Sequence, residues 1–331
     1  MMKKTRNEYF DFLRGIAIIF VLGIHAFSSN GSVYTVLRYE NIAIRQVFNC
    51  AVPLFLAISG YFLGKANLDT KELRISFWKK QIPKVYIPCL VWSFPNLCNS
   101  IFMTDSPATI ALARFFFCDY GVFYFIIVII QMYLLLPYIK DFCTKRGVVV
   151  VAVLSLLSVV SMNIFYRQIA IPRFGNVLAL ACPAHWLGFF ALGVYLANFS
   201  LRQYKLWFPI CLLLTGLFLS FYETLMWPKT MGERYGYKIT AFIYSYGSIL
   251  FLFSKKVEAL FLRNICIVGR VINRIGVISF GIYLIHFAIV KYLAFECWLF
   301  NGFIALLLSI LAIAVSKKTF PVFSRKYLGF Y

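Results

Sequence analysis

Long apolar runs constrain the fold of this chain more than any other feature. A helix needs about 20 mostly apolar residues to cross the hydrocarbon core of a bilayer. Ten runs of roughly this length follow one another: Phe10 to Phe27, Val47 to Gly64, Val85 to Phe102, Tyr120 to Ile139, Val148 to Phe165, Ala179 to Phe199, Leu206 to Phe221, Ile239 to Phe253, Val277 to Phe295 and Trp298 to Val315. None alternates apolar with polar residues as a barrel strand does. We therefore expect an all-α polytopic membrane protein, a bundle of about ten transmembrane helices.

Composition excludes a soluble protein. Hydrophobic residues make up 62% of the 331 residues and charged residues 14%, against roughly 45–50% and 25% in soluble domains. The stretches between the apolar runs are short. We therefore expect residues 1–331 to form one integral-membrane domain with no appended soluble domain.

The charge distribution predicts how the chain is oriented. Lys and Arg number 33 against 12 Asp and Glu, a net charge of +21. Of these 33 basic residues, 23 fall in segments on the same side as the N-terminus, nine fall on the opposite side, and Arg14 lies inside a run. Cytoplasmic loops of membrane proteins are enriched in Lys and Arg. Both termini are therefore predicted to be cytoplasmic, and the excess charge indicates topology and contact with anionic lipid rather than nucleic-acid binding.

Two ionisable residues of the first run are the strongest functional candidates. Ionisable side chains within a bilayer are costly and by default functional. Arg14 and His25 are 11 residues apart, so on a helix they share one face at a separation of roughly 16 Å. This distance suits a phosphopantetheine arm whose phosphate meets Arg14 and whose thioester meets His25. Asp11, one turn before Arg14, would orient its guanidinium. The same geometry also suits a proton relay or an ion pathway.

Further polar residues within the runs predict a shared cavity. Ser279, Tyr283 and His286 fall on one helix face. Tyr124 and Gln131 lie seven residues apart, and Ser59 precedes a glycine that permits close helix approach. His185, the third histidine, is interpreted as a hydrogen-bonding contact between helices. The nine cysteines show no paired spacing, so no metal site is expected.

These motifs resemble the acyltransferase 3 family of integral-membrane acyltransferases. The segment EYFDFLRGIAIIFVLGIHAF has the family's Arg and His with ten residues between, here Arg14 and His25. The further matching segments, in the family's order, are VPLFLAISGYFLGK, FYFIIVIIQMYLLLPYI, FFALGVYLA and NRIGVISFGIYLIH. One departure is WKKQIPKVYIP, where Lys79, Lys80 and Lys84 stand in place of the usual basic pair. Lysine binds phosphate as a point charge without the bidentate fork of arginine.

The resemblance implies an O-acetyltransferase in the bacterial inner membrane. It implies acetyl-CoA as the acyl donor, with Arg14, Lys79, Lys80 and Lys84 at its phosphates, and a carbohydrate acceptor such as a surface polysaccharide or its lipid-linked precursor. His25 is carried over as the essential histidine. It would act either as general base on the acceptor hydroxyl or as the carrier of the acetyl group.

Two points stay open at this stage. The outer loop from Tyr222 to Lys238 has the aromatic and carboxylate content of a sugar-binding segment, although for any one of its residues an interfacial aromatic belt with surface charge is the preferred explanation. A transporter or flippase of an anionic glycolipid or small metabolite would also use intramembrane Arg and His residues. The sequence lacks the internal repeat and paired broken helices of many transporters, which favours the enzyme. It does not set the oligomeric state.

Overall fold

A computed structural model describes residues 7–29, 39–104, 107–168, 181–198, 202–226, 238–293 and 295–331. Within these ranges the chain is entirely helical, which confirms the predicted all-α class. The longer helices are α1 (Glu8–Ser29), α3 (Ala51–Leu63), α4 (Lys71–Phe102), α6 (Tyr124–Ile139), α7 (Lys145–Gln168), α9 (Pro183–Leu196), α10 (Trp207–Met226), α11 (Ile239–Phe253), α14 (Ser279–Val290) and α15 (Trp298–Thr319). The shorter elements are α2 (Tyr39–Val47), η2 (Phe48–Cys50), α5 (Ala108–Phe116), η3 (Gly121–Phe123), η4 (Lys140–Phe142), α12 (Lys255–Arg263), α13 (Ile267–Val277) and α16 (Pro321–Lys326).

Seven spans in the described part of the chain are long and apolar enough to cross a membrane, or eight if the bent pair α13 and α14 is one span. The helices α9 and α11 are apolar but shorter, with 14 and 15 residues. The chain is thus a multi-pass membrane protein, while a count of ten remains a prediction. The ninth run, Val277 to Phe295, contains the 12-residue α14, and α13, which precedes it in a segment expected to be a loop, meets α14 at an angle of 83°.

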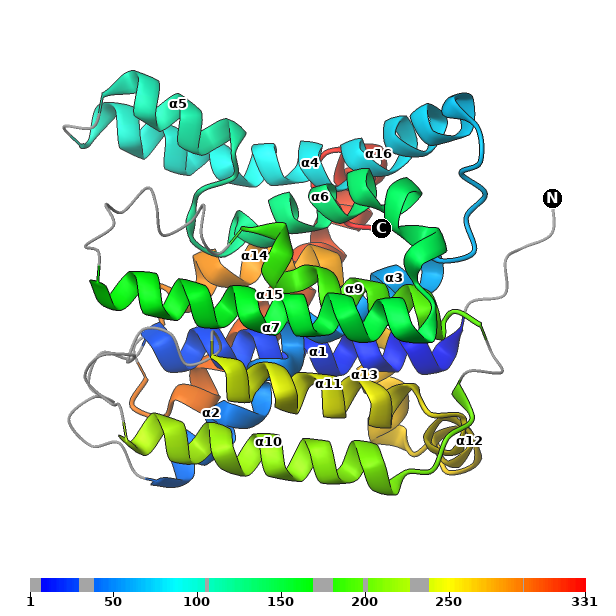
Figure 1. Cartoon of the computed structure of the whole chain (residues 1–331). Helices are drawn as coiled ribbons and strands as arrows, with labels where there is room; N and C mark the ends of the chain where they lie inside the picture. Colours follow the sequence, from blue (N-terminus) through cyan, green and yellow to red (C-terminus); the bar gives the residue numbers. More distant parts are fainter. Residues whose placement is uncertain are drawn as a thin grey trace.

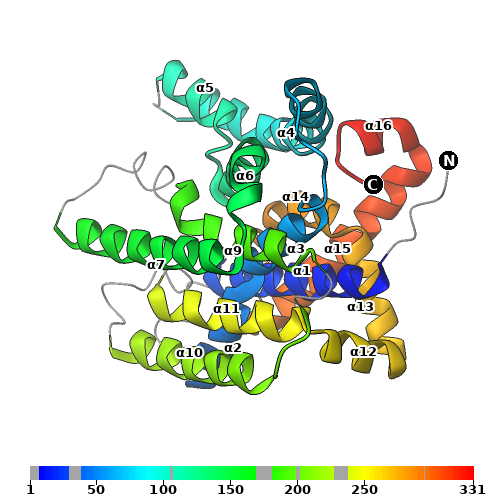
Figure 2. The same cartoon turned by 45° about the vertical axis from the view of Figure 1, so that its right-hand side comes forward.

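The main helices run nearly parallel, with α1 in the middle of the molecule (Figure 1). The N-terminal ends of α1, α4 and α7 lie on the same side as the C-terminal ends of α6 and α11 (Figure 1). We call this side the inner end, because it carries the segments predicted to be cytoplasmic, and the opposite side the outer end. In the turned view, α4 and α6 lie above α1, and α10 and α11 lie below it (Figure 2).

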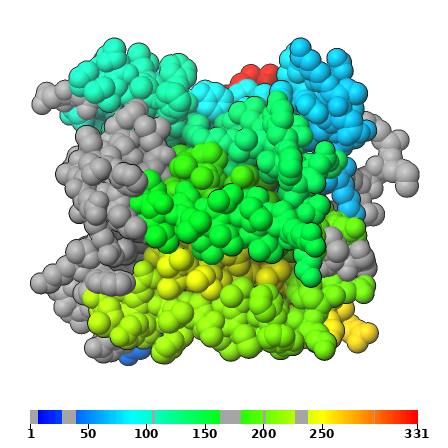
Figure 3. Space-filling model, in the orientation of Figure 1, coloured from blue at the N-terminus to red at the C-terminus, as the bar shows by residue number. Residues whose placement is uncertain are grey.

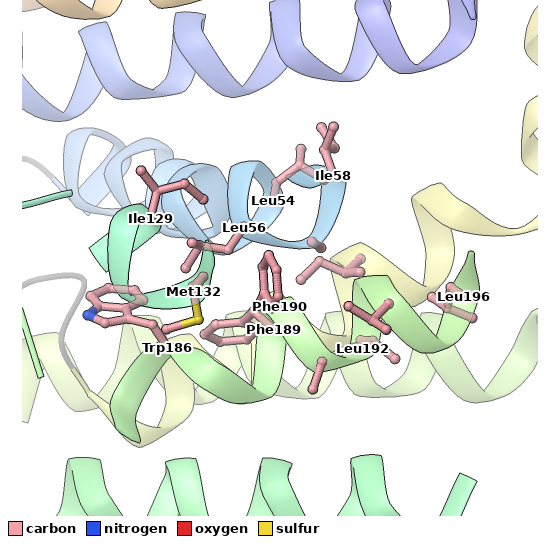
Figure 4. Packing of buried hydrophobic residues seen from close by; sticks show 14 of the residues in the cluster. Leu54, Leu56, Ile58, Ile129, Met132, Trp186, Phe189, Phe190, Leu192 and Leu196 are labelled. Carbon is pink, nitrogen blue, oxygen red and sulfur yellow. The ribbon is translucent and has the colours of Figure 1, made fainter. Parts of the chain in front are cut away.

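Close helix contacts fix α1 and α3 at the centre. A Cβ atom on Gly276 of α13 would lie 1.7 Å from the carbonyl oxygen of Asp11, and one on Gly193 of α9 would lie 2.0 Å from that of Ala57. Only glycine allows backbones to approach so closely. Beside this contact, aliphatic and aromatic side chains of α3, α6 and α9 fill the core, including Leu56, Met132 and Phe189 (Figure 4).

The outward faces of the peripheral helices are apolar. Figure 3 shows α7 and α10 along one face of the molecule. Their exposed side chains include Val149, Val153, Leu157, Leu214 and Phe218. Exposed apolar surface of this extent on helices of membrane-spanning length is typical of contact with lipid.

Two boundaries differ from the sequence prediction in ways that affect the site. The second candidate span begins at Glu40, not Val47, because α2 and η2 continue into α3. Arg14 is therefore not the only basic residue inside a span, since Arg45 lies inside this one. The lysines Lys79, Lys80 and Lys84 were expected in a loop but lie on α4, which begins after the Thr70 N-cap and continues through three prolines.

Candidate active site

Helix α1 carries both main candidates on one continuous helix. Arg14 lies near the inner end, where its Nη1 atom donates to Asp11 Oδ1 at 2.8 Å. The Asp11 side chain is 1% exposed and that of Arg14 is 31% exposed. The guanidinium also lies over the ring of Phe62 on α3, 4.8 Å from its centroid. The Arg14 guanidinium is thus fixed by Asp11 and Phe62 and is still partly accessible to solvent.

His25 lies deeper along α1, beside a second histidine. Its ring centroid is 5.3 Å from that of His286 on α14, with the two planes tilted by 48°, and 5.5 Å from the ring of Phe287. The His25 side chain is partly exposed, whereas His286 is fully buried. Two imidazoles from helices far apart in the sequence therefore meet in the interior of the bundle.

Two tyrosines border this histidine pair. The Tyr283 hydroxyl donates to the carbonyl of Val122 at 2.6 Å, and its ring lies 5.9 Å from that of His286. Tyr124 is close enough to Tyr283 for their hydroxyls to interact electrostatically. Ser279, the first residue of α14, is buried on the same helix. Tyr283 is thus in contact with His286, Tyr124 adjoins Tyr283, and Ser279 lies two turns before His286 on α14.

Two residues that were predicted to line the cavity, Ser59 and Gln131, show no contact with the histidine pair among the described residues. Ser59 is half-buried on α3. Gln131 lies two turns after Tyr124 on α6, and its Oε1 atom is buried without a hydrogen-bond partner among the described residues. In that part of the chain, nothing joins either side chain directly to His25.

Basic residues gather at the inner end of α4. Lys79 and Lys80 are exposed and border a surface hollow of about 520 Å³. Lys84 lies within electrostatic range of Lys80 and of Arg325 on α16.

The C-terminal segment connects this basic group with Arg14. The Tyr331 hydroxyl donates to the carbonyl of Lys84 at 3.0 Å. Tyr133 of α6 is within electrostatic range of both Arg14 and Tyr331. Arg325 and Tyr331 were not predicted from the sequence, because the short segment after the last apolar run carries no motif.

A buried polar network at the outer end was also missed. Arg45 is 4% exposed, donates to Asn49 at 2.5 Å, and lies within electrostatic range of His25. Asn49 donates to Gln46 at 2.9 Å, as does Ser220 of α10. The signal available in the sequence was the four-residue spacing of Arg45 and Asn49, which places both on one helix face.

Lys238 joins this network to the outer ends of α10 and α11. Its ammonium group donates to the Ser220 carbonyl and to the Thr224 hydroxyl. Burial lowers the pKa of Lys238 to about 8, with a further lowering by Arg45 and an opposing contribution from Glu223. The rest of the proposed sugar-binding loop, residues 227–237, lies outside the described residues.

Comparison with known protein families identifies the family of this chain. The model of the acyltransferase domain family matches residues 7–316, nearly the whole chain and both histidines of the pair. The chain belongs to this family. No curated protein and no solved structure is significantly similar to it. The protein is therefore a membrane acyltransferase.

Proposed function

We propose that this acyltransferase moves an acetyl group from cytoplasmic acetyl-CoA to a hydroxyl of a cell-surface polysaccharide or of its lipid-linked sugar precursor. The observation that carries this proposal is the placement of Arg14 and His25 on one unbroken helix, roughly 16 Å apart along its axis. A phosphopantetheine arm has a comparable length. A donor phosphate at Arg14 therefore allows the thioester to reach the partly exposed imidazole of His25.

The inner basic residues support binding of the nucleotide part of the donor. Lys79 and Lys80 border one hollow, and Lys84 lies within electrostatic range of Lys80 and Arg325. Tyr331, which donates to the Lys84 carbonyl, and Arg14 both lie within electrostatic range of Tyr133. The phosphates of acetyl-CoA are anionic near neutral pH, so such a group attracts them before the thioester enters the bundle. Arg325 lies beyond the family-matched residues, so its part in donor binding rests on this structure alone.

His25 acts on the acetyl group in one of two ways. As a general base it takes the proton of the acceptor hydroxyl while that oxygen attacks the thioester. As an acyl carrier it takes the acetyl group itself and passes it on. Acetylation of the protein after exposure to acetyl-CoA alone, lost in His25→Ala, supports the carrier role, and its absence supports the base.

The acceptor is placed at the outer end. The network around Arg45 and Lys238 supplies donors for sugar hydroxyls or for an acidic group close to His25. With both termini in the cytoplasm of a bacterial cell, this end faces away from the cytoplasm, where surface polysaccharide is modified. Acetyl-CoA then enters from the inner end.

Purified protein in nanodiscs tests the activity directly. Acetyl-CoA is supplied with candidate glycans, and free CoA thiol is followed over time. The expected result is acceptor-dependent CoA release that His25→Ala abolishes. If no CoA is released with any acyl donor and acceptor tested, while a glycolipid is moved across the membrane of vesicles that contain the protein, the transporter interpretation replaces the enzyme interpretation.

A further inference from the structure

The tautomer of His286 is fixed by the backbone of its own helix. Its Nδ1 atom lies 2.7 Å from the carbonyl oxygen of Tyr283 and 3.2 Å from that of Ile282. Carbonyl oxygens only accept hydrogen bonds, so Nδ1 must carry the hydrogen. In a neutral ring the other nitrogen, Nε2, then holds a lone pair and can only accept.

This Nε2 atom is buried and has no hydrogen-bond partner within the described residues. Buried polar atoms are nearly always paired, and one without a partner needs an explanation. A hydrogen-bond acceptor fixed in this way is suited to a hydrogen-bond donor that is present only during the reaction cycle.

The surroundings leave few candidates for that donor. The Tyr283 hydroxyl already donates its one hydrogen to the Val122 carbonyl. Phe287, the other ring beside His25, has no hydrogen-bonding atom. Among the ring contacts described for His286, the one that offers a free N–H donor is with His25, 5.3 Å away between centroids. His286 is fully buried while His25 is partly exposed, so a substrate reaches His25 first.

We propose that His286 is a positioning residue whose Nε2 accepts a hydrogen bond from the N–H of His25 when His25 becomes positively charged. This inference rests on the proposed acetyl transfer. Because the two rings are not hydrogen-bonded in the described structure, the bond forms by a rotation of the His25 ring as charge develops. His286 then stands where hydrolytic triads place a carboxylate.

Both roles of His25 create this charge. As a base, His25 takes the proton of the acceptor hydroxyl while the new C–O bond forms and the C–S bond breaks, and it then gives that proton to the CoA thiolate. As a carrier, His25 forms a C–N bond as the C–S bond breaks, giving an acetylimidazolium and a thiolate. The acceptor oxygen then takes the acetyl group, the C–N bond breaks, and the hydroxyl proton ends on the thiolate. In each case an N–H of cationic His25 needs an acceptor away from the reacting atoms.

Two substitutions of His286 separate this role from packing. His286→Phe keeps the ring volume and removes the acceptor. We expect kcat to fall about 10- to 100-fold, because a hydrogen bond to a charged group is lost, with the KM for acetyl-CoA unchanged within about 3-fold. His286→Gln places an amide oxygen near the position of Nε2. We expect it to recover at least about 5-fold of the kcat lost in the Phe variant.

The matched control is His185→Phe. His185 is also buried within the bundle, where its Nδ1 shares a hydrogen bond of 2.8 Å with Ser158 of α7. We expect this variant to keep kcat within about 3-fold. Thermal unfolding of each variant in detergent establishes that folding is retained.

The outcomes separate this inference from the proposed function. A His286→Phe variant within 2-fold of the wild-type kcat, beside an inactive His25→Ala, overturns the positioning role and leaves the acetyl transfer standing. A fully active His25→Ala overturns the proposed function itself. If His286→Phe does not fold, Gln is compared with His286→Asn, whose shorter amide cannot reach the Nε2 position. Equal kcat values for Gln and Asn overturn the proposal, and a higher value for Gln supports it.

Discussion

The role of Arg14 in holding the donor can be tested only if its buried neighbour is changed as well. Arg14→Met removes the guanidinium but also removes the ion-pair partner of Asp11, whose side chain is 1% exposed. Breaking a buried ion pair from one side costs about 3–5 kcal/mol. We therefore choose the double variant Asp11→Asn/Arg14→Met, with Asp11→Asn alone as its matched control.

The expected size of the effect follows from the exposure of Arg14. A hydrogen bond to a charged group contributes about 1.5–3 kcal/mol. Because the guanidinium is 31% exposed, solvent screens the contact, and the lower part of that range applies. About 1.5–2 kcal/mol corresponds to a KM for acetyl-CoA raised about 10- to 30-fold. The kcat should stay within about 3-fold, since Arg14 is roughly 16 Å from His25.

Steady-state CoA release at varied acetyl-CoA concentration measures both constants, and His25→Ala supplies the contrast. That variant should lose kcat by more than about 100-fold, as expected for loss of a base or nucleophile. Its binding of acetyl-CoA, measured by calorimetry, should be unchanged. The reasoning is wrong if the double variant loses kcat at constant KM, or if the Arg14 and His25 variants lose donor binding equally.

Three further substitutions test other parts of the structure. Arg45→Gln should raise the KM for the acceptor about 10-fold without raising the donor KM, because Arg45 lies in the outer polar network proposed to bind the acceptor; an unchanged acceptor KM would contradict this. Glu258→Gln should lower the free energy of unfolding by about 3 kcal/mol, because it leaves the fully buried Arg202, 2.9 Å away, without its countercharge. Reversible unfolding in detergent measures that loss, and a change below about 1 kcal/mol would contradict it. Gly276→Ala should cost about 1–3 kcal/mol by the same assay, since its Cβ would overlap backbone of α1; a stability equal to wild type would show that α1 can move aside.

The positions of the apolar helices could be predicted from the sequence. The eighth run, Ile239 to Phe253, has the same bounds as α11, and the tenth begins at Trp298, as α15 does. Crossing a bilayer requires a local apolar segment of fixed length, so this property is readable from a window of sequence alone. The same window misses α2, whose residues are largely polar and continue into α3.

Which polar groups meet could be predicted only in part. Periodicity placed Arg14 and His25 on one face of α1 and Tyr283 and His286 on one face of α14. The approach of His25 to His286 depends on how α1 packs against α14, which no local pattern encodes. Arg45 was missed for a related reason, since its burial is produced by neighbouring helices rather than by apolar residues beside it in the sequence.

The glycine contact between α1 and α13 also limits how the enzyme admits its two substrates. A Cβ on Gly15 would lie 2.1 Å from the carbonyl oxygen of Ile272, and Gly276 makes the reciprocal contact with Asp11. Backbones this close interlock, so α1 and α13 are expected to move together as one unit. Under the proposed acetyl transfer, any alternation between cytoplasmic and outward access is therefore expected to come from movement of other helices relative to this pair.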